Sequence, residues 1–114
     1  MTEADHRPWG YYLVLAETPD CKVKRIVVDP NKKLSLQRHS HRREQWVIVS
    51  GEAVVTIEGR EFLLRQGESV TIPCGATHRL ENRDTTAVAF IEVQTGEYFG
   101  EDDIERLADD YGRA

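Results

Sequence analysis

The segment LSLQRHSHRREQW, residues 34–46, combines the alternation of a β-strand with several side chains that can bind a metal ion. Alternate side chains of an extended strand share one face, so Gln37, His39 and His41 are expected to project together. We expect the chain to reverse after these residues and to return the carboxylate of Glu44 to a position over His39. Taken alone, the segment fits either a site for a divalent cation or a solvated polar edge strand.

Around this segment, short apolar stretches recur about every ten residues and are separated by Gly, Pro or Asn. They include KVKRIVV, QWVIVSG, AVVTIEG, EFLLRQG, SVTIPCG and AVAFIEV. Such spacing is typical of an all-β sandwich or barrel. We expect one domain spanning residues 1–114, with a barrel core at about 22–94. Residues 50–53 and 57–62 are expected to form hairpin turns.

The carboxy-terminal segment has a different pattern. Ile104, Leu107, Ala108 and Tyr111 follow the i, i+3, i+4, i+7 spacing of one helix face. Acidic residues precede them, where the helix dipole favours negative charge. The pattern predicts a short α-helix at about residues 101–111, packed against the sheet.

Composition and charge exclude several classes of partner. The formal net charge of −5 argues against nucleic acid. The longest apolar run, YYLVLA, is far too short to cross a bilayer, and the first ten residues have no secretory signal, so we expect a cytoplasmic protein. Residues 22–43 nevertheless carry eight cations and one anion, a local positive field that suits a small anionic substrate.

Some strands are apolar on both faces. In QWVIVS, Trp46 and Ile48 point to one side while Val47 and Val49 point to the other. A sandwich strand has only one inner face, so the other apolar face needs separate cover. We therefore expect a homodimer.

A second segment, GESVTIPCGATHRLEN at residues 67–82, resembles a motif of the cupin superfamily. The pattern G-x5-P-x-G-x2-H-x3-N is matched at every defined position, by Gly67, Pro73, Gly75, His78 and Asn82. The first cupin motif is matched at His39, Glu44 and Gly51. It departs at Gln37, where the family has histidine, and at Asn31, where it has glycine; asparagine tolerates positive φ, so the turn is expected to survive.

The resemblance extends over residues 7–113 and is closest to the type II mannose-6-phosphate isomerases. That family is usually met as the carboxy-terminal cupin of bifunctional mannose-1-phosphate guanylyltransferase/mannose-6-phosphate isomerases. It implies a double-stranded β-helix, or jelly-roll barrel, that interconverts mannose 6-phosphate and fructose 6-phosphate through an enediol. One departure is Gln45, where the family has histidine. An iron dioxygenase and a non-catalytic sugar- or metabolite-binding cupin are the alternatives.

The metal ligands implied by the resemblance are Gln37, His39, Glu44 and His78. Two imidazoles, one amide oxygen and one carboxylate suit one divalent ion of borderline softness. Zinc is the first choice, with manganese, iron or nickel as alternatives.

Isomerisation also needs a group that moves a proton and a cation that holds the phosphate. His41 is expected to be the acid/base because of its ordinary pKa, with Glu81 as the alternative. The expected phosphate-binding residues are Arg42 and Arg79, whose guanidinium groups bind phosphate through two hydrogen bonds, and then Lys24 and Lys33.

Overall fold

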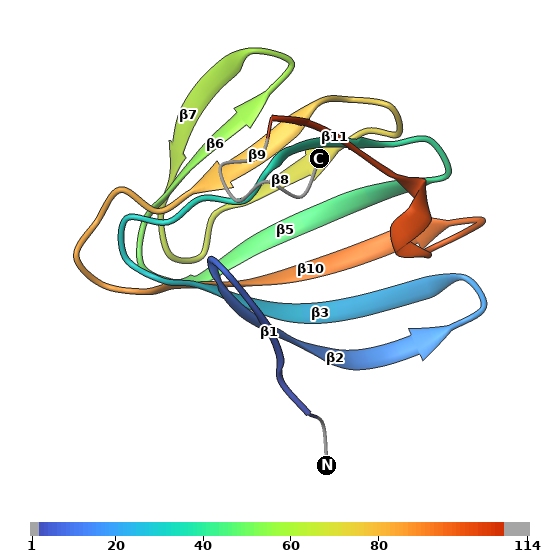
Figure 1. The fold of residues 1–114 in the computed structure, drawn as a ribbon, viewed down its shortest axis with the longest axis horizontal. Coiled ribbons are helices and arrows are strands. Elements are labelled where there is room, and N and C mark those ends of the chain that lie inside the picture. Colours follow the sequence, from blue (N-terminus) through green and yellow to red (C-terminus); the bar gives the residue numbers. More distant parts are fainter. Residues whose placement is uncertain (1–2, 109–114) are drawn as a thin grey trace.

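The computed structural model describes residues 3–108, which form two antiparallel β-sheets that face each other (Figure 1). The first sheet has the order β1-β2-β3-β10-β5-β8, and its strands are β1 (Asp5–Arg7), β2 (Gly10–Thr18), β3 (Cys21–Val28), β10 (Val88–Gly96), β5 (Arg42–Ser50) and β8 (Ser69–Ile72). The second has the order β11-β4-β9-β6-β7, and its strands are β11 (Ile104–Ala108), β4 (Leu36–His39), β9 (His78–Glu81), β6 (Ala53–Ile57) and β7 (Arg60–Leu64). The prediction of an all-β fold is confirmed.

Strand alternation builds the core between the sheets. Along β5 every second side chain, including Trp46 and Ile48, is buried, and the residues between them are exposed. Trp46 packs on Phe90 of the neighbouring β10 with 5.1 Å between ring centroids. Val47 and Val49 are 39% and 40% exposed on the outer face, as the sequence pattern indicated.

The tight turns depend on residues that accept positive φ. Glu58 and Gly59, with φ of 48° and 78°, close the predicted hairpin between β6 and β7. Asn31 has φ of 61°, so it adopts the conformation expected where the motif has glycine. The turn at residues 50–53 is not a hairpin, because it carries the chain from β5 in the first sheet to β6 in the second.

The predicted carboxy-terminal α-helix is wrong over the residues that the structure describes. A single turn of 3-10 helix, η1 (Glu101–Asp103), is followed by β11, which pairs with the edge strand β4. The pairing satisfies backbone groups of both strands, whereas an isolated helix this short is marginal. Leu107 is 44% exposed, so the apolar helical face is not buried. Residues 109–111 of the predicted helix lie outside the described part.

A buried asparagine ties the end of β3 to the connection between β9 and β10. The side-chain nitrogen of Asn82 donates hydrogen bonds to the carbonyls of Val28, Asp29 and Thr86 at 3.0, 3.2 and 2.8 Å. Its Oδ1 accepts a bond of 2.9 Å from the backbone of Asp84. Asn82 is fully buried, which explains why this position of the motif needs an amide.

The strands at the two ends of the chain extend the sheets beyond the predicted barrel core. β1 and β2 continue the first sheet, and β11 forms an edge of the second. Within residues 3–108, no helix has the length and apolar character needed to cross a membrane.

Candidate metal centre

Three of the predicted ligands meet between the two sheets. His39 ends β4, Glu44 lies near the start of β5 and His78 begins β9, and each is at most 3% exposed. His39 Nε2 lies 3.1 Å and His78 Nε2 lies 3.8 Å from the Glu44 carboxylate. One possible ligand atom of each residue lies within 4.8 Å of the ligand atoms of the other two. The expected return of Glu44 to His39 is confirmed, but the carboxylate arrives from the opposite sheet.

The protonation of this cluster follows from burial and from neighbouring charge. Burial alone would raise the pKa of Glu44, but the hydrogen bond with His39 and the positive groups around it, including Arg42, hold that pKa below its usual range. Trp46 Nε1 donates to Glu44 Oε1 at 3.0 Å, and Arg42 Nε donates to Oε2 at 3.1 Å. Burial lowers the pKa of His78. The cluster therefore contains a carboxylate beside a neutral imidazole.

This donor set fits a divalent cation. His78 Nδ1 donates to the Ala76 carbonyl at 3.0 Å, which leaves the Nε2 lone pair directed at the cluster. Among the described residues, His39 Nδ1 is a buried nitrogen with no hydrogen-bond partner. Two imidazole nitrogens and one carboxylate are a donor set for zinc, iron, manganese or nickel.

The fourth predicted ligand, Gln37, lies beside these three. It is the residue of β4 paired with His78 on β9. Its amide nitrogen donates to Ser35 Oγ at 2.6 Å. The structure thus brings Gln37 to the neighbourhood of the cluster with its amide engaged by Ser35.

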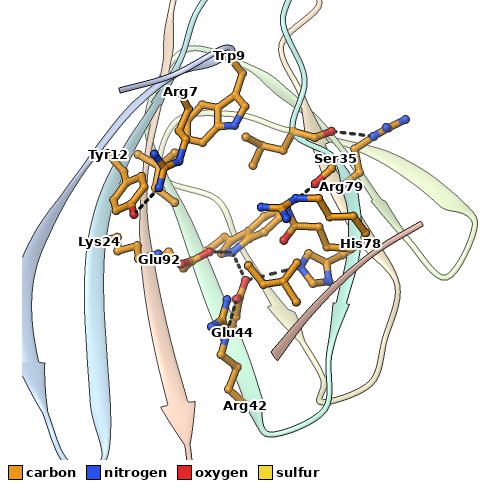
Figure 2. A pocket seen from close by; sticks show the side chains of 16 residues that line it. Arg7, Trp9, Tyr12, Lys24, Ser35, Arg42, Glu44, His78, Arg79 and Glu92 are labelled. Atoms are coloured by element: carbon orange, nitrogen blue, oxygen red, sulfur yellow. Dashed lines mark hydrogen bonds and ion pairs between the residues drawn. The ribbon is translucent and has the colours of Figure 1, made fainter. Parts of the chain in front are cut away.

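Two residues of the cluster, Glu44 and His78, line a pocket between the sheets (Figure 2). The cavity has a volume of about 70 Å³. Its lining includes five cationic and two acidic side chains, namely Arg7, Lys24, Arg42, Arg79 and Arg106 with Glu44 and Glu92. Figure 2 shows Arg42, Glu44 and His78 toward one end and Arg7 and Trp9 toward the other. The excess of positive charge favours an anionic ligand.

Neither predicted acid/base residue lines this pocket. β4 ends at His39, so the alternation stops before His41, whose side chain is 55% exposed and forms an ion pair of 2.8 Å with Asp103. The hydrogen bond with Asp103 raises the pKa of His41. Glu81 lies on β9 out of phase with the buried His78, and its carboxylate pairs with Arg83 at 2.9 Å. Both assignments lack support from the geometry.

The two predicted arginines differ in position. Arg42 is buried beside the cluster, with Nη2 3.4 Å from His39 Nε2. Arg79 donates to the carbonyls of Leu34 and Ala108 at 2.9 and 3.2 Å, and it therefore fastens β11 at the pocket's edge.

The two predicted lysines also differ in position. Lys24 is buried in the pocket, with Nζ 4.3 Å from the centroid of the Tyr12 ring. Lys33 is not part of the pocket lining and forms a backbone bridge with Glu81.

Sequence reasoning missed several residues of the lining. Glu92 accepts a hydrogen bond of 3.1 Å from Trp46 and one of 2.6 Å from Gln94. Burial, together with repulsion from Glu44, raises the pKa of Glu92 to about 8. Alternation along AVAFIEV could have indicated this inward carboxylate, since it shares a face with the buried Phe90. Arg106 was missed because its segment was interpreted as a helix.

The chain is similar to known proteins over nearly its whole length. The profile of the family described as "Mannose-6-phosphate isomerase C-terminal" matches residues 1–109. A mannose-1-phosphate guanylyltransferase of Klebsiella pneumoniae is 47% identical over 108 residues, which are 95% of this chain and 23% of that protein. The alginate biosynthesis protein AlgA of Pseudomonas aeruginosa is 49% identical over 95% of this chain and 22% of its own length. The chain thus spans less than a quarter of these relatives.

Solved structures give the same fold at lower identity. The capsular polysaccharide assembling protein CapF of Staphylococcus aureus has a TM-score of 0.85 and 23% identity, covering 96% of this chain and 35% of that one. The oxalate decarboxylase OxdC of Bacillus subtilis has a TM-score of 0.79 and 18% identity, covering 92% of this chain and 30% of its own. The architecture is the cupin barrel expected from the motifs.

Proposed function

The chain belongs to the family of mannose-6-phosphate isomerase C-terminal domains, and we propose that it is a metal-dependent isomerase of mannose 6-phosphate and fructose 6-phosphate. The observation that carries the proposal is the buried group of His39, Glu44 and His78, of which Glu44 and His78 line a cationic pocket. The curated relatives are much longer than this chain, so activity of this part alone is itself proposed.

The chemistry moves a proton between C2 and C1 of the sugar through an enediol. A divalent cation held by His39, Glu44 and His78 would supply the Lewis acidity that polarises the carbonyl. Arg42 lies within 3.4 Å of His39 and offers a guanidinium group to oxygens at the same end of the pocket. These positions support binding of the reacting end of the sugar at the cluster.

A general acid/base must lie within reach of the reacting carbons. Glu92 and Lys24 are buried and line the pocket, unlike His41 and Glu81. Glu92 is also close to the cluster, because Trp46 Nε1 donates to both Glu92 and Glu44. We therefore assign proton transfer to Glu92, with Lys24 as the alternative.

The departure at Gln45 does not affect the pocket. Gln45 is exposed on β5 between the buried Glu44 and Trp46, and its side chain accepts a hydrogen bond of 3.0 Å from Thr71 on β8. A histidine missing from this outer face removes no group from the pocket. The exposed Gln45 therefore gives no support to the alternative of a non-catalytic sugar- or metabolite-binding cupin.

Other parts of the proposal rest on the sequence. The substrate is a small sugar phosphate, and we retain the expectation of a cytoplasmic homodimer. The exposed apolar side chains of Val47 and Val49 offer a face for self-association.

The test is an isomerase assay on the purified chain, which couples fructose 6-phosphate formation to a dye or nicotinamide readout. The chain is supplied in turn with zinc, manganese, iron and nickel, and the His78→Leu variant is run beside it. Conversion by the wild type that the variant lacks would support the proposal. A metal-loaded protein that binds one ion and shows no conversion would refute it, and uptake of oxygen with iron would favour the dioxygenase alternative.

A further inference from the structure

We propose that Arg106, on the last strand of the described chain, binds the phosphate group at the far end of the sugar. This assignment rests on the proposed function and identifies the residue that gives it specificity for a phosphorylated substrate. It departs from the expectation that Arg42 and Arg79 bind the phosphate.

Strand register places Arg106 on the pocket face. In the pairing of β11 with β4, Ile104 lies opposite His39 and Arg106 lies opposite Gln37. Gln37 in turn lies opposite His78 on β9. Directly opposed residues of antiparallel strands project to the same side of a sheet, so Arg106, Gln37 and His78 form a row across it. Ile104 and Arg106 both line the pocket, in agreement with this register.

Arg106 also has unused hydrogen-bonding capacity. Within residues 3–108 its Nε is buried and lacks a hydrogen-bond partner. A buried donor without a partner is destabilising unless a ligand supplies the acceptor. Phosphate oxygens are strong acceptors for the guanidinium fork.

The other arginines of the pocket already have partners. Arg42 is bound to Glu44 and to the Phe99 carbonyl. Arg79 is bound to two backbone carbonyls. Arg7 forms an ion pair with Asp5 at 2.6 Å. Of these four cations, Arg106 is therefore the one whose donors are best placed to receive an anion.

Arg106 and Arg42 also lie at different positions along the pocket. The phosphate of a hexose 6-phosphate lies at the opposite end of the carbon chain from the reacting carbons. Arg42 lies beside the cluster, within 3.4 Å of His39, and so belongs to the reacting end. Arg106 is displaced from His39 by two residues along the sheet and by one strand, about 7 Å and about 5 Å. That offset matches an anchor for the far end of the substrate.

β11 is held at several points, which fixes Arg106 in place. The Asp103 carboxylate accepts hydrogen bonds from the backbone nitrogens of Ser40 and His41 at 3.3 and 3.0 Å. The ion pair of Arg38 with Glu105, at 2.6 Å, is exposed to solvent and adds little to this attachment. Together with the bond from Arg79 to the Ala108 carbonyl, the bonds to Asp103 hold the strand against β4 before any ligand arrives. Because the strand is already ordered, less conformational entropy is lost when the ligand binds, and more of the contact energy contributes to affinity.

The experiment is isothermal titration of mannose 6-phosphate into zinc-loaded wild type, Arg106→Gln, Arg106→Lys and Arg38→Gln proteins. Arg38→Gln is the matched control, because it removes one positive charge from the same pair of strands on the exposed face. Loss of a charge-assisted bidentate contact predicts about 10- to 100-fold weaker binding for Arg106→Gln. The affinity of Arg106→Lys should lie between those of the wild type and Arg106→Gln, since lysine keeps the positive charge but cannot form the bidentate guanidinium contact. Arg38→Gln should bind within about threefold of the wild type.

Zinc affinity and melting temperature are measured on the same four proteins. Unchanged zinc affinity in Arg106→Gln, with weakened sugar phosphate binding, would support the inference. Equal binding by Arg106→Gln and wild type would overturn it and leave the proposed function intact. A wild type that binds mannose 6-phosphate through Arg106 without isomerising it would overturn the proposed function alone. A wild type that does not bind it would contradict the inference as well.

Discussion

Adding a divalent cation should raise the melting temperature of this protein, and His78→Leu should abolish the effect. The three ligands come from three strands and from positions 39, 44 and 78, so the unfolded chain does not preserve the site. A cation that binds only the folded state at a free concentration 100 times its Kd stabilises that state by about 2.7 kcal/mol. His78→Leu keeps a side chain of similar volume but supplies no ligand atom.

The expected size of the shift follows from chain length. An unfolding entropy of about 2.1 cal/mol/K per residue gives about 240 cal/mol/K for 114 residues. Stabilisation by about 2.7 kcal/mol then raises Tm by about 11 °C.

The assay is thermal unfolding followed by circular dichroism, with chelator or with zinc, manganese, iron or nickel at a free concentration about 100 times its Kd. His41→Leu is the matched control, because it removes an exposed imidazole two residues from His39 and leaves the cluster complete. The control should keep most of the shift. A wild type that none of these cations stabilises would refute the reasoning, as would a shift that survives in His78→Leu and disappears in His41→Leu.

Three further results are expected. Asn82→Ala should lower the free energy of unfolding by about 3 kcal/mol in urea denaturation, because three backbone carbonyls lose a buried donor; a loss below about 1 kcal/mol would contradict this. Asp103→Ala should weaken mannose 6-phosphate binding several-fold in titration calorimetry, since it frees the strand that carries Arg106, and unchanged affinity would argue against that link. Glu92→Gln should reduce isomerase turnover at least about tenfold with zinc affinity within about threefold of wild type, and full turnover would transfer the proton-moving role to Lys24.

The parts of the fold that could be predicted are those that local pattern determines. Alternation and turn residues indicate the strands, and they place the apolar side chains of β5 on two faces. The positive φ of Asn31 follows from residue type at a position where the motif has glycine. The resemblance of two motifs to those of the cupin superfamily implied His39, Glu44 and His78 as ligands, and the structure brings these three together.

The incorrect structural predictions fall where the pairing of strands in the tertiary structure, rather than local sequence pattern, determines the conformation. The segment at 104–108 has helical spacing, but pairing with the open edge of β4 makes it a strand and turns Arg106 toward the pocket. In the sequence, His41 continues the alternation of β4. In the structure, however, the strand ends two residues earlier and the His41 side chain contacts Asp103. Neither the partner of an edge strand nor the end of a strand is encoded in local periodicity, so Arg106 was missed as a lining residue and His41 was expected on the pocket face, where it does not lie.

The claim on which the account depends is that His39, Glu44 and His78 bind one divalent cation between the sheets. Diffraction data collected at the absorption edge of the added metal, from crystals of the purified chain, test it most directly. The expected result is a single anomalous peak about 2.0–2.2 Å from one donor atom of each of these three residues. A peak at some other group of side chains, with none between these three, would contradict the claim.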